Sequence, residues 1–151
     1  MFDLKMISSI NNSLINNQET TVNEIVELNK TTAKYGLTLN KEQAIDLINN
    51  RNIVLKEVGR IELGVGILEK LIYEFCDSSY IYKDEYLDIL EELTNIFYEY
   101  RCEFDGKLTD EQIIKYMRNK FDTSCNGSLE LLASKELEYL KEHLKELINE
   151  I

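Results

Sequence analysis

The scarcity of turn-forming residues constrains this chain most: it has no proline and only six glycines in 151 residues. Sandwiches and barrels need many tight turns, and glycine and proline supply the backbone conformations that such turns use. Apolar residues instead recur at steps of three and four, which is typical of amphipathic helices. The sequence therefore predicts an all-α fold, a single-domain helical bundle of about six to eight helices over residues 1–151.

Two capping boxes mark where helices begin. Asn40 is followed three residues later by Gln43, and Thr109 is followed in the same way by Gln112. In this pattern each side chain accepts a hydrogen bond from the backbone N–H of the other residue. Helices are therefore expected to start directly after residues 40 and 109.

The other predicted boundaries rest on weaker signals. Residues 1–19 carry apolar side chains at helical spacing and predict a loosely attached N-terminal helix. A second helix is expected over residues 22–35, ended by Gly36, and the longest over residues 85–104, capped by Asp84. The run from Gly59 to Gly66 predicts either a short extended stretch near residues 60–65 or a tight turn between helices.

Charge and composition argue against several classes of function. The formal net charge is −11, and residues 76–112 alone carry eleven acidic and three basic side chains, a net of −8. Nucleic-acid phosphates and anionic membrane surfaces would repel such a chain. Cys76, Cys102 and Cys125 are widely spaced and odd in number, which favours reduced thiols. No basic leader or long apolar run is found, so we expect a cytoplasmic protein.

Catalytic and ligand-binding motifs are poorly represented. His143 is the only histidine, and no grouping of His and Cys has the spacing of a metal site. Gly64 and Gly66 begin a dinucleotide-binding pattern, but Glu69 stands where its third glycine belongs. The run from Asp122 resembles the start of a calcium loop, but its twelfth position is Ala133 instead of a bidentate glutamate. We therefore expect no metal and no cofactor, and more weight falls on a non-enzymatic role.

Arg51 is the most informative single residue. At 100° per residue it falls within the apolar stripe of the helix predicted over residues 41–58, on the same face as Ala44, Ile48, Leu55 and Val58. A guanidinium on a core-facing stripe needs a carboxylate or carbonyl partner. We therefore predict that Arg51 is buried within salt-bridge distance of a carboxylate, that of Glu62 first and those of Glu69 and Asp77 as alternatives.

Two hypotheses for function stay open at this point. The first is a non-enzymatic helical module for protein interaction or regulation, because leucines at heptad spacing near the C-terminus could join a protein partner or a second copy of the chain. The second is a small-molecule or anion-binding protein, with an enzyme as one possibility. Its predicted site comprises Arg51, Arg60, Glu62, Asp77 and Tyr80.

Several stretches together resemble an uncharacterised bacterial family, a domain of unknown function. The central one runs from Gly59-Arg60-Ile61-Glu62-Leu63-Gly64-Val65-Gly66-Ile67-Leu68 through Lys70-Leu71-Ile72 to Phe75-Cys76-Asp77-Ser78. Residues 32–37 and 125–130 carry the resemblance further, so that it covers roughly residues 25–140. It implies a free-standing small cytosolic protein and assigns no activity.

Overall fold

The computed structural model describes residues 18–62 and 64–151. Helices dominate these residues and no strand occurs among them, so the all-α prediction is confirmed. The N-terminal helix predicted over residues 1–19 lies almost entirely outside the described part of the chain. No helix in the described part is both long enough and apolar enough to cross a bilayer.

The helices follow one another through short connections. A first helix covers residues 18–27. It is followed by α2 (Asn29–Thr32), η1 (Ala33–Tyr35), α3 (Lys41–Glu57), α4 (Ile67–Phe75), η2 (Lys83–Glu85), α5 (Tyr86–Phe104), α6 (Asp110–Asp122), α7 (Leu129–Ala133), α8 (Lys135–Glu142) and α9 (Leu144–Glu150).

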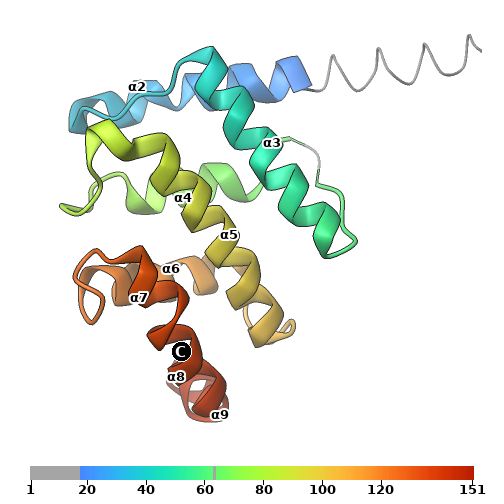
Figure 1. The fold of residues 1–151 in the computed structure, drawn as a ribbon, viewed down its shortest axis with the longest axis vertical. Helices are drawn as coiled ribbons and strands as arrows, with labels where there is room; N and C mark the ends of the chain where they lie inside the picture. Colours follow the sequence, from blue (N-terminus) through green and yellow to red (C-terminus); the bar gives the residue numbers. More distant parts are fainter. Residues whose placement is uncertain (1–17, 63) are drawn as a thin grey trace, which may run out of the picture.

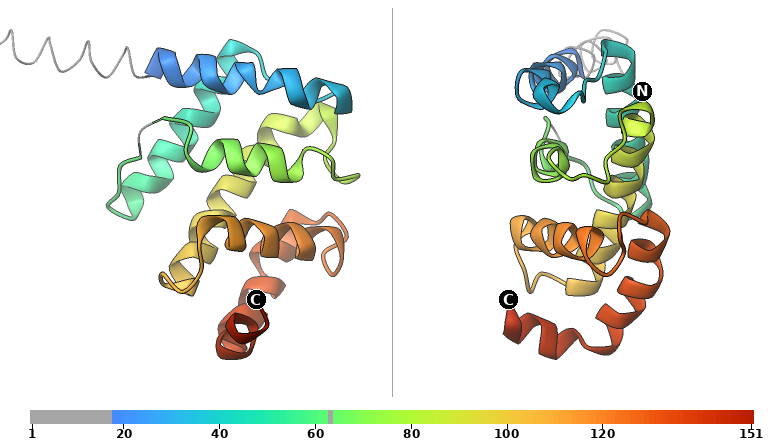
Figure 2. Two further views of the ribbon diagram at one scale, coloured as in Figure 1. Left: turned by 180° about the vertical axis from the view of Figure 1, so that it is seen from behind. Right: turned by 90° about the vertical axis from the view of Figure 1, so that its left-hand side faces the viewer.

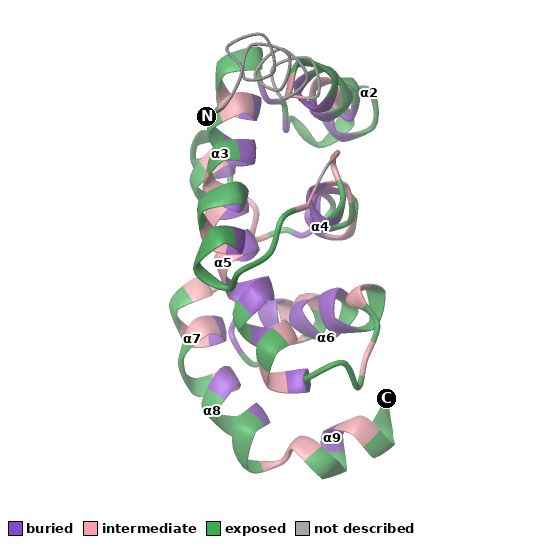
Figure 3. Ribbon diagram, turned by 90° about the vertical axis from the view of Figure 1, so that its right-hand side faces the viewer, coloured by how far each residue is buried: buried purple, intermediate pink, exposed green. Residues whose placement is uncertain are grey.

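These elements form two layers. On one side α3, α5, α7 and α8 follow one another along the length of the molecule (Figure 3). On the other side the N-terminal helices, α4 and α6 are stacked one below another, and α9 lies at the far end (Figures 1 and 2). Each layer turns its apolar faces toward the other, as amphipathic helices must to bury them.

Two hydrophobic clusters fill the space between the layers. One joins the N-terminal helix to α3, α4 and the start of α5, and includes Ile25, Leu47 and Leu90. The other joins α4 and α5 to the C-terminal helices, and includes Phe97 and Phe121. Because α4 and α5 contribute to both clusters, they connect the two ends of the molecule.

Both predicted capping boxes are confirmed. At the start of α3 the side chains of Asn40 and Gln43 each accept a hydrogen bond from the backbone N–H of the other residue, and those of Thr109 and Gln112 do so at the start of α6. The predicted cap at Asp84 is wrong: the 3-10 turn η2 leads directly into α5, and no side-chain hydrogen bond caps that helix.

Three other boundaries are settled by the structure. Between α3 and α4 the described residues form turns and irregular loop, without a strand. Val58 follows the last residue of α3 and is 41% exposed, so its predicted place in the buried stripe is wrong. The C-terminal helical region is interrupted at Ser134 and again at His143, which divides it into α7, α8 and α9. Its leucines Leu137, Leu140 and Leu147 are already buried in the chain's own core.

Candidate functional site

Arg51 is as deeply buried as the sequence predicted. It lies on α3 one turn from Ile48 and one turn from Leu55, both of which are in the core, and its own exposure is 2%. The nearest carboxylate is that of Glu62, with Oε1 lying 3.9 Å from an Arg51 terminal nitrogen. The helical phase is therefore confirmed, and of the three candidate carboxylates it is Glu62 that lies within salt-bridge distance of Arg51.

Backbone carbonyls, however, are the closest partners of this guanidinium. One terminal nitrogen donates to the carbonyl oxygens of Gly64 at 2.6 Å and Val65 at 3.4 Å. The other donates to the carbonyl of Glu62 at 3.3 Å and to Oδ1 of Asn52 at 3.1 Å, and Nε also donates to Asn52. These five contacts match the five N–H donors of arginine. No donor is left over for a bound anion.

Burial lowers the pKa of Arg51 from its ordinary value, and the nearby carboxylate of Glu62 opposes that shift. An arginine stays charged across the ordinary pH range, so its burial requires this dense set of acceptors. The loop between α3 and α4 is the source of most of them. Arg51 therefore holds that loop against α3.

Glu62 fastens the same loop at two further points. Its Oε1 accepts a hydrogen bond of 2.9 Å from the backbone N–H of Ile67, the first residue of α4. Its Oε2 accepts one of 2.9 Å from the hydroxyl of Tyr98 on α5. A carboxylate at a helix N-terminus is favoured by the unpaired N–H groups there. We call Arg51, Asn52, Glu62 and Tyr98 the Arg51 network.

Gly66 leaves room for the Glu62 carboxylate. It has a φ of +46°, and a Cβ added there would lie 1.7 Å from Oε1 of Glu62. Both the backbone conformation and the space require glycine at this position. The glycine at 66 is therefore explained by the packing of the loop and that at 64 by its positive φ of +74°, in keeping with the failure of the dinucleotide-binding pattern.

Asp77 and Tyr80 lie at the opposite end of α4 from the Arg51 network. Asp77 pairs with Arg118 of α6 at 2.7 Å, and Arg118 also pairs with Asp122 at 2.5 Å. Because α4 has nine residues, its two ends are roughly 13 Å apart. The five residues of the predicted site are thus divided between two locations, with Arg51, Arg60 and Glu62 at one and Asp77 and Tyr80 at the other.

This second location is a structural tie between α4 and α6. Ser78 donates a hydrogen bond of 2.7 Å to Oδ1 of Asp122, and the ring of Tyr80 packs edge-on against Phe121. Arg118 also donates to the backbone carbonyl of Glu74. Both oxygens of Asp122 are engaged, so the carboxylate that would begin a calcium loop serves to join helices.

Sequence reasoning missed Arg118, although a signal for it was present. Arg118 stands four residues after Ile114 and three before Phe121, both buried, so it lies on the apolar face of α6. Arg51 was found from the same pattern on α3. A charged residue on the buried face of a helix therefore locates both the Arg51 network and the tie between α4 and α6.

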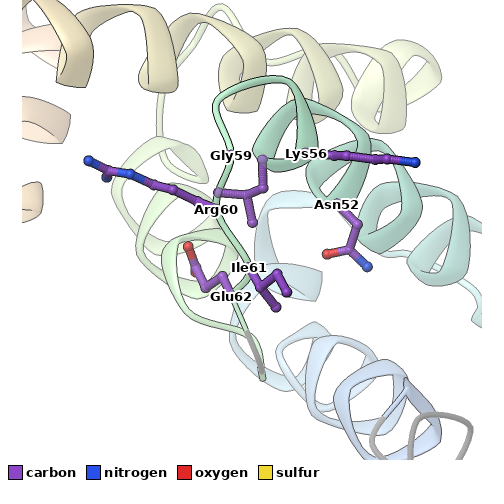
Figure 4. A pocket seen from close by; sticks show the side chains of 7 residues that line it. Asn52, Lys56, Gly59, Arg60, Ile61 and Glu62 are labelled. Carbon is purple, nitrogen blue, oxygen red and sulfur yellow. The ribbon is translucent and has the colours of Figure 1, made fainter.

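A groove opens beside the locked loop. It has a volume of about 530 Å³ and is lined by Asn52, Leu55, Lys56, Gly59, Arg60, Ile61 and Glu62, which we call the loop groove. Figure 4 shows the side chains of Lys56 and Arg60 extending away from each other, with Asn52 and Ile61 between them. Two basic side chains thus lie on either side of a groove whose apolar lining comes from Leu55 and Ile61.

The exposed aliphatic side chains near this groove are unusual for a charged surface. Ile61 is 91% exposed and Ile53 is 61% exposed, and the half-exposed Val58 lies between them in the chain. Apolar surface that gathers in one place on a folded domain marks an interaction site more often than scattered single residues do. Ile61 lines the loop groove, whereas Ile53 and Val58 line a separate hollow of about 370 Å³ against α5, so Ile61 is the exposed aliphatic side chain of the groove itself.

Arg60 borders a second, more polar hollow. This pocket of about 320 Å³ lies against α5 and is also lined by Tyr98, Arg101, Cys102 and Asp110. Arg101 pairs with Asp110 at 3.6 Å, whereas Arg60 has no ion pair with any residue that the structure describes. Arg60 is therefore the predicted site residue whose charge is free to meet a ligand.

The fold and the site define a class of protein. It is an all-α protein of two helical layers, with a groove beside an inter-helix loop that Arg51 and Glu62 hold in place. The chain belongs to the family of unknown function DUF6323, whose profile matches residues 24–150. The predicted membership of a family of unknown function is thereby confirmed. No curated protein and no solved structure matches the chain.

Proposed function

We propose that this protein is a non-enzymatic interaction module that binds an apolar segment of a partner protein in the loop groove. The observation that carries the proposal is the near-complete exposure of Ile61 at the edge of this groove. Burying an isoleucine side chain from water contributes about 1.5–3 kcal/mol. A partner that covers Ile61 gains this contribution without any change in the fold.

The contacts of Glu62, the residue after Ile61, support this role. Glu62, next to Ile61, is held by Ile67 and Tyr98, and its carbonyl is held by Arg51. These contacts restrict the backbone beside Ile61 before any partner arrives. Such preorganisation lowers the entropy lost on binding, which is one of the main costs of association.

The charges around the groove favour a particular kind of partner. Lys56 and Arg60 line the groove on either side of its apolar centre. Complementary charge steers association and suppresses the wrong partners. We therefore infer that the partner segment carries acidic side chains beside its apolar ones, with the periodicity of an amphipathic helix.

The C-terminal region is a weaker candidate for the partner surface. The heptad spacing there suggested a protein partner or a homodimer, but Leu137, Leu140 and Leu147 are buried within the chain itself. A dimer through these residues would have to expose them first. The loop groove needs no such rearrangement.

Site-directed photo-crosslinking tests the proposed surface. A photoreactive amino acid at position 61 of the full chain, in the source cells, should capture a partner that position 82 does not. Tyr82 is also exposed but lies in the connection before η2. The partner identified by mass spectrometry is then purified, and its affinity for wild type, Ile61→Asp and the control Tyr82→Asp is measured by calorimetry.

Ile61→Asp should weaken this binding at least tenfold, since about 1.4 kcal/mol corresponds to a factor of ten. Tyr82→Asp should bind as wild type does. Equal affinities of wild type and Ile61→Asp would refute the proposed surface. So would the failure of position 61 to capture anything beyond what position 82 captures.

A second candidate function is the binding of a small anion, and the free charge of Arg60 favours it. The guanidinium borders the 320 Å³ pocket together with Tyr98 and Arg101. Calorimetry with inorganic phosphate would then show a saturable site that Arg60→Gln abolishes and that Lys56→Gln leaves intact. Absence of measurable heat at millimolar phosphate would remove this candidate.

A further inference from the structure

The described chain begins beside the loop groove. Gln18 donates a hydrogen bond of 3.3 Å from its side chain to Oδ1 of Asn49 on α3. Asn52, which lines the groove, stands one helical turn further along α3. Figure 2 shows the start of the first helix and the loop after α3 on the same side of the molecule.

The seventeen residues that precede Gln18 have the composition of a groove-binding segment. Over residues 6–14, Met6, Ile7, Ile10 and Leu14 fall within an arc of about 100° at 100° per residue, whereas Leu4 and Ile15, which flank this stretch, fall outside it. Ser8, Asn11 and Asn12 lie outside that arc. A segment with this pattern has one apolar face to bury, as peptides that dock as helices in apolar grooves do.

The distances allow this segment to reach the groove. Lys56 stands seven residues after Asn49 on α3, so the groove extends roughly 10 Å from the point where Gln18 contacts the helix. Seventeen residues span roughly 25 Å even as a helix. The length of chain before Gln18 is therefore more than sufficient to fold back along α3 and cover Ile61.

We propose that residues 1–17 occupy the loop groove of the same chain with their apolar stripe, and that a partner must displace them. The inference rests on the proposed function, because it gives the same groove an intramolecular occupant that competes with the partner. The match to the family begins only at residue 24, so this occupant lies outside the matched part of the chain.

The chain contains no tryptophan, so one introduced at position 61 is a unique reporter of the groove. In the full chain carrying Ile61→Trp, adding Leu14→Asp should move the indole emission to longer wavelength and increase its quenching by acrylamide. Asn12→Asp adds the same charge on the opposite face and should leave both unchanged. Ile10→Asp provides a second variant within the stripe, and circular dichroism checks that each variant stays folded.

A synthetic peptide of residues 1–17 provides the matching measurement in trans. An occupied groove reduces the apparent affinity for a competing peptide by the fraction of molecules in which it is open. The Leu14→Asp chain should therefore bind this peptide roughly tenfold more tightly than the chain with Asn12→Asp. Equal affinity, together with an indole spectrum that Leu14→Asp leaves unchanged, would overturn the inference.

Dilution decides whether the occupant comes from the same chain. An intramolecular occupant predicts that the indole spectrum of the Ile61→Trp chain is independent of protein concentration. A spectrum that changes on dilution would overturn the proposal in favour of a second copy.

Failure of this inference is distinct from failure of the proposed function. If partner binding depends on Ile61 but is equal in Leu14→Asp and Asn12→Asp, only the intramolecular occupant is refuted. If the indole at position 61 responds to Leu14→Asp but no partner depends on Ile61, only the proposed function is refuted.

Discussion

The hydroxyl of Tyr98 donates a hydrogen bond of 2.9 Å to the carboxylate of Glu62, across 36 positions of the chain. This bond joins the middle of α5 to the loop after α3. Burial and the nearby negative charge of Glu62 raise the pKa of Tyr98 above its ordinary value, so it is a neutral donor at physiological pH. The contact holds Glu62, one of the residues that line the loop groove, against α5.

Tyr98→Phe should lower the free energy of unfolding by about 1–3 kcal/mol, because the hydrogen bond it removes is accepted by a charged group. Urea denaturation followed by circular dichroism measures the change. Tyr82→Phe is the matched control, since its ring is largely exposed, and it should stay within about 0.5 kcal/mol of wild type. Equal stabilities for the two variants would show that the contact contributes nothing.

Gly66→Ala should be far more destabilising than Gly59→Ala. Both glycines have positive φ, which costs about 1–2 kcal/mol of backbone strain for alanine in the left-handed region, and Gly66 (φ +46°, ψ −124°) lies outside that region in a conformation still less open to alanine. At Gly59 nothing lies within 4 Å of the added Cβ, whereas at Gly66 the Glu62 carboxylate must move and lose its hydrogen bonds. A difference of at least about 2 kcal/mol between the two variants is expected in thermal or urea unfolding. Similar values would contradict the close packing of Glu62 on Gly66.

Arg51→Met should destabilise the protein by about 2–4 kcal/mol, because it leaves the carbonyls of Glu62, Gly64 and Val65 without their donor. A partnership with the carboxylate alone would predict a much smaller effect, since an apolar side chain often replaces a buried ion pair at little cost. Arg51→Lys should recover only part of the loss, because an ammonium lacks the planar arrangement of five donors. Limited proteolysis should cut the loop after α3 faster in both variants, and unchanged cleavage would contradict its attachment through Arg51.

The Asp77 carboxyl should titrate with a pKa below its ordinary value, because the hydrogen bond from Arg118 and its positive charge favour the ionised form. A depressed native pKa contributes stability above the unfolded pKa, and this contribution is lost as the pH falls below about 4. Asp77 is more than half exposed, so the effect on stability is small. Carboxyl-detected NMR titration of wild type and Arg118→Met should show the Asp77 pKa rise in the variant. An unchanged value would mean that the pair is absent in solution.

Calcium should bind no more tightly than about millimolar, because the loop lacks its twelfth-position carboxylate and Asp122 is engaged by Ser78 and Arg118. Calorimetric titration of the full chain checks this. Asp122→Asn should destabilise the fold, since it weakens the tie between α4 and α6, without altering the calcium response. A micromolar site that Asp122→Asn removes would contradict the structural role given to this residue.

Local patterns were sufficient for much of the fold. The capping boxes at Asn40 and Thr109 involve side chains and backbone within three residues, so sequence spacing alone locates them. Asp84 failed as a cap because a 3-10 turn leads into α5, and nothing in the spacing distinguishes such a turn from a capped helix start. Val58 failed because a periodic pattern continues past the residue at which the helix ends.

The candidate site also combines features that the sequence determines with features that only the tertiary structure decides. The sequence by itself determined that Arg51 faces the core and needs acceptors, because the helical phase and the desolvation of a permanent charge are local facts. Only the tertiary structure decided that loop carbonyls surround it, that Asp77 belongs to Arg118, and that Ile61 is left exposed beside a groove. Those outcomes depend on how α4 and α5 pack, and packing brings together residues whose separation along the chain carries no information about their distance in space.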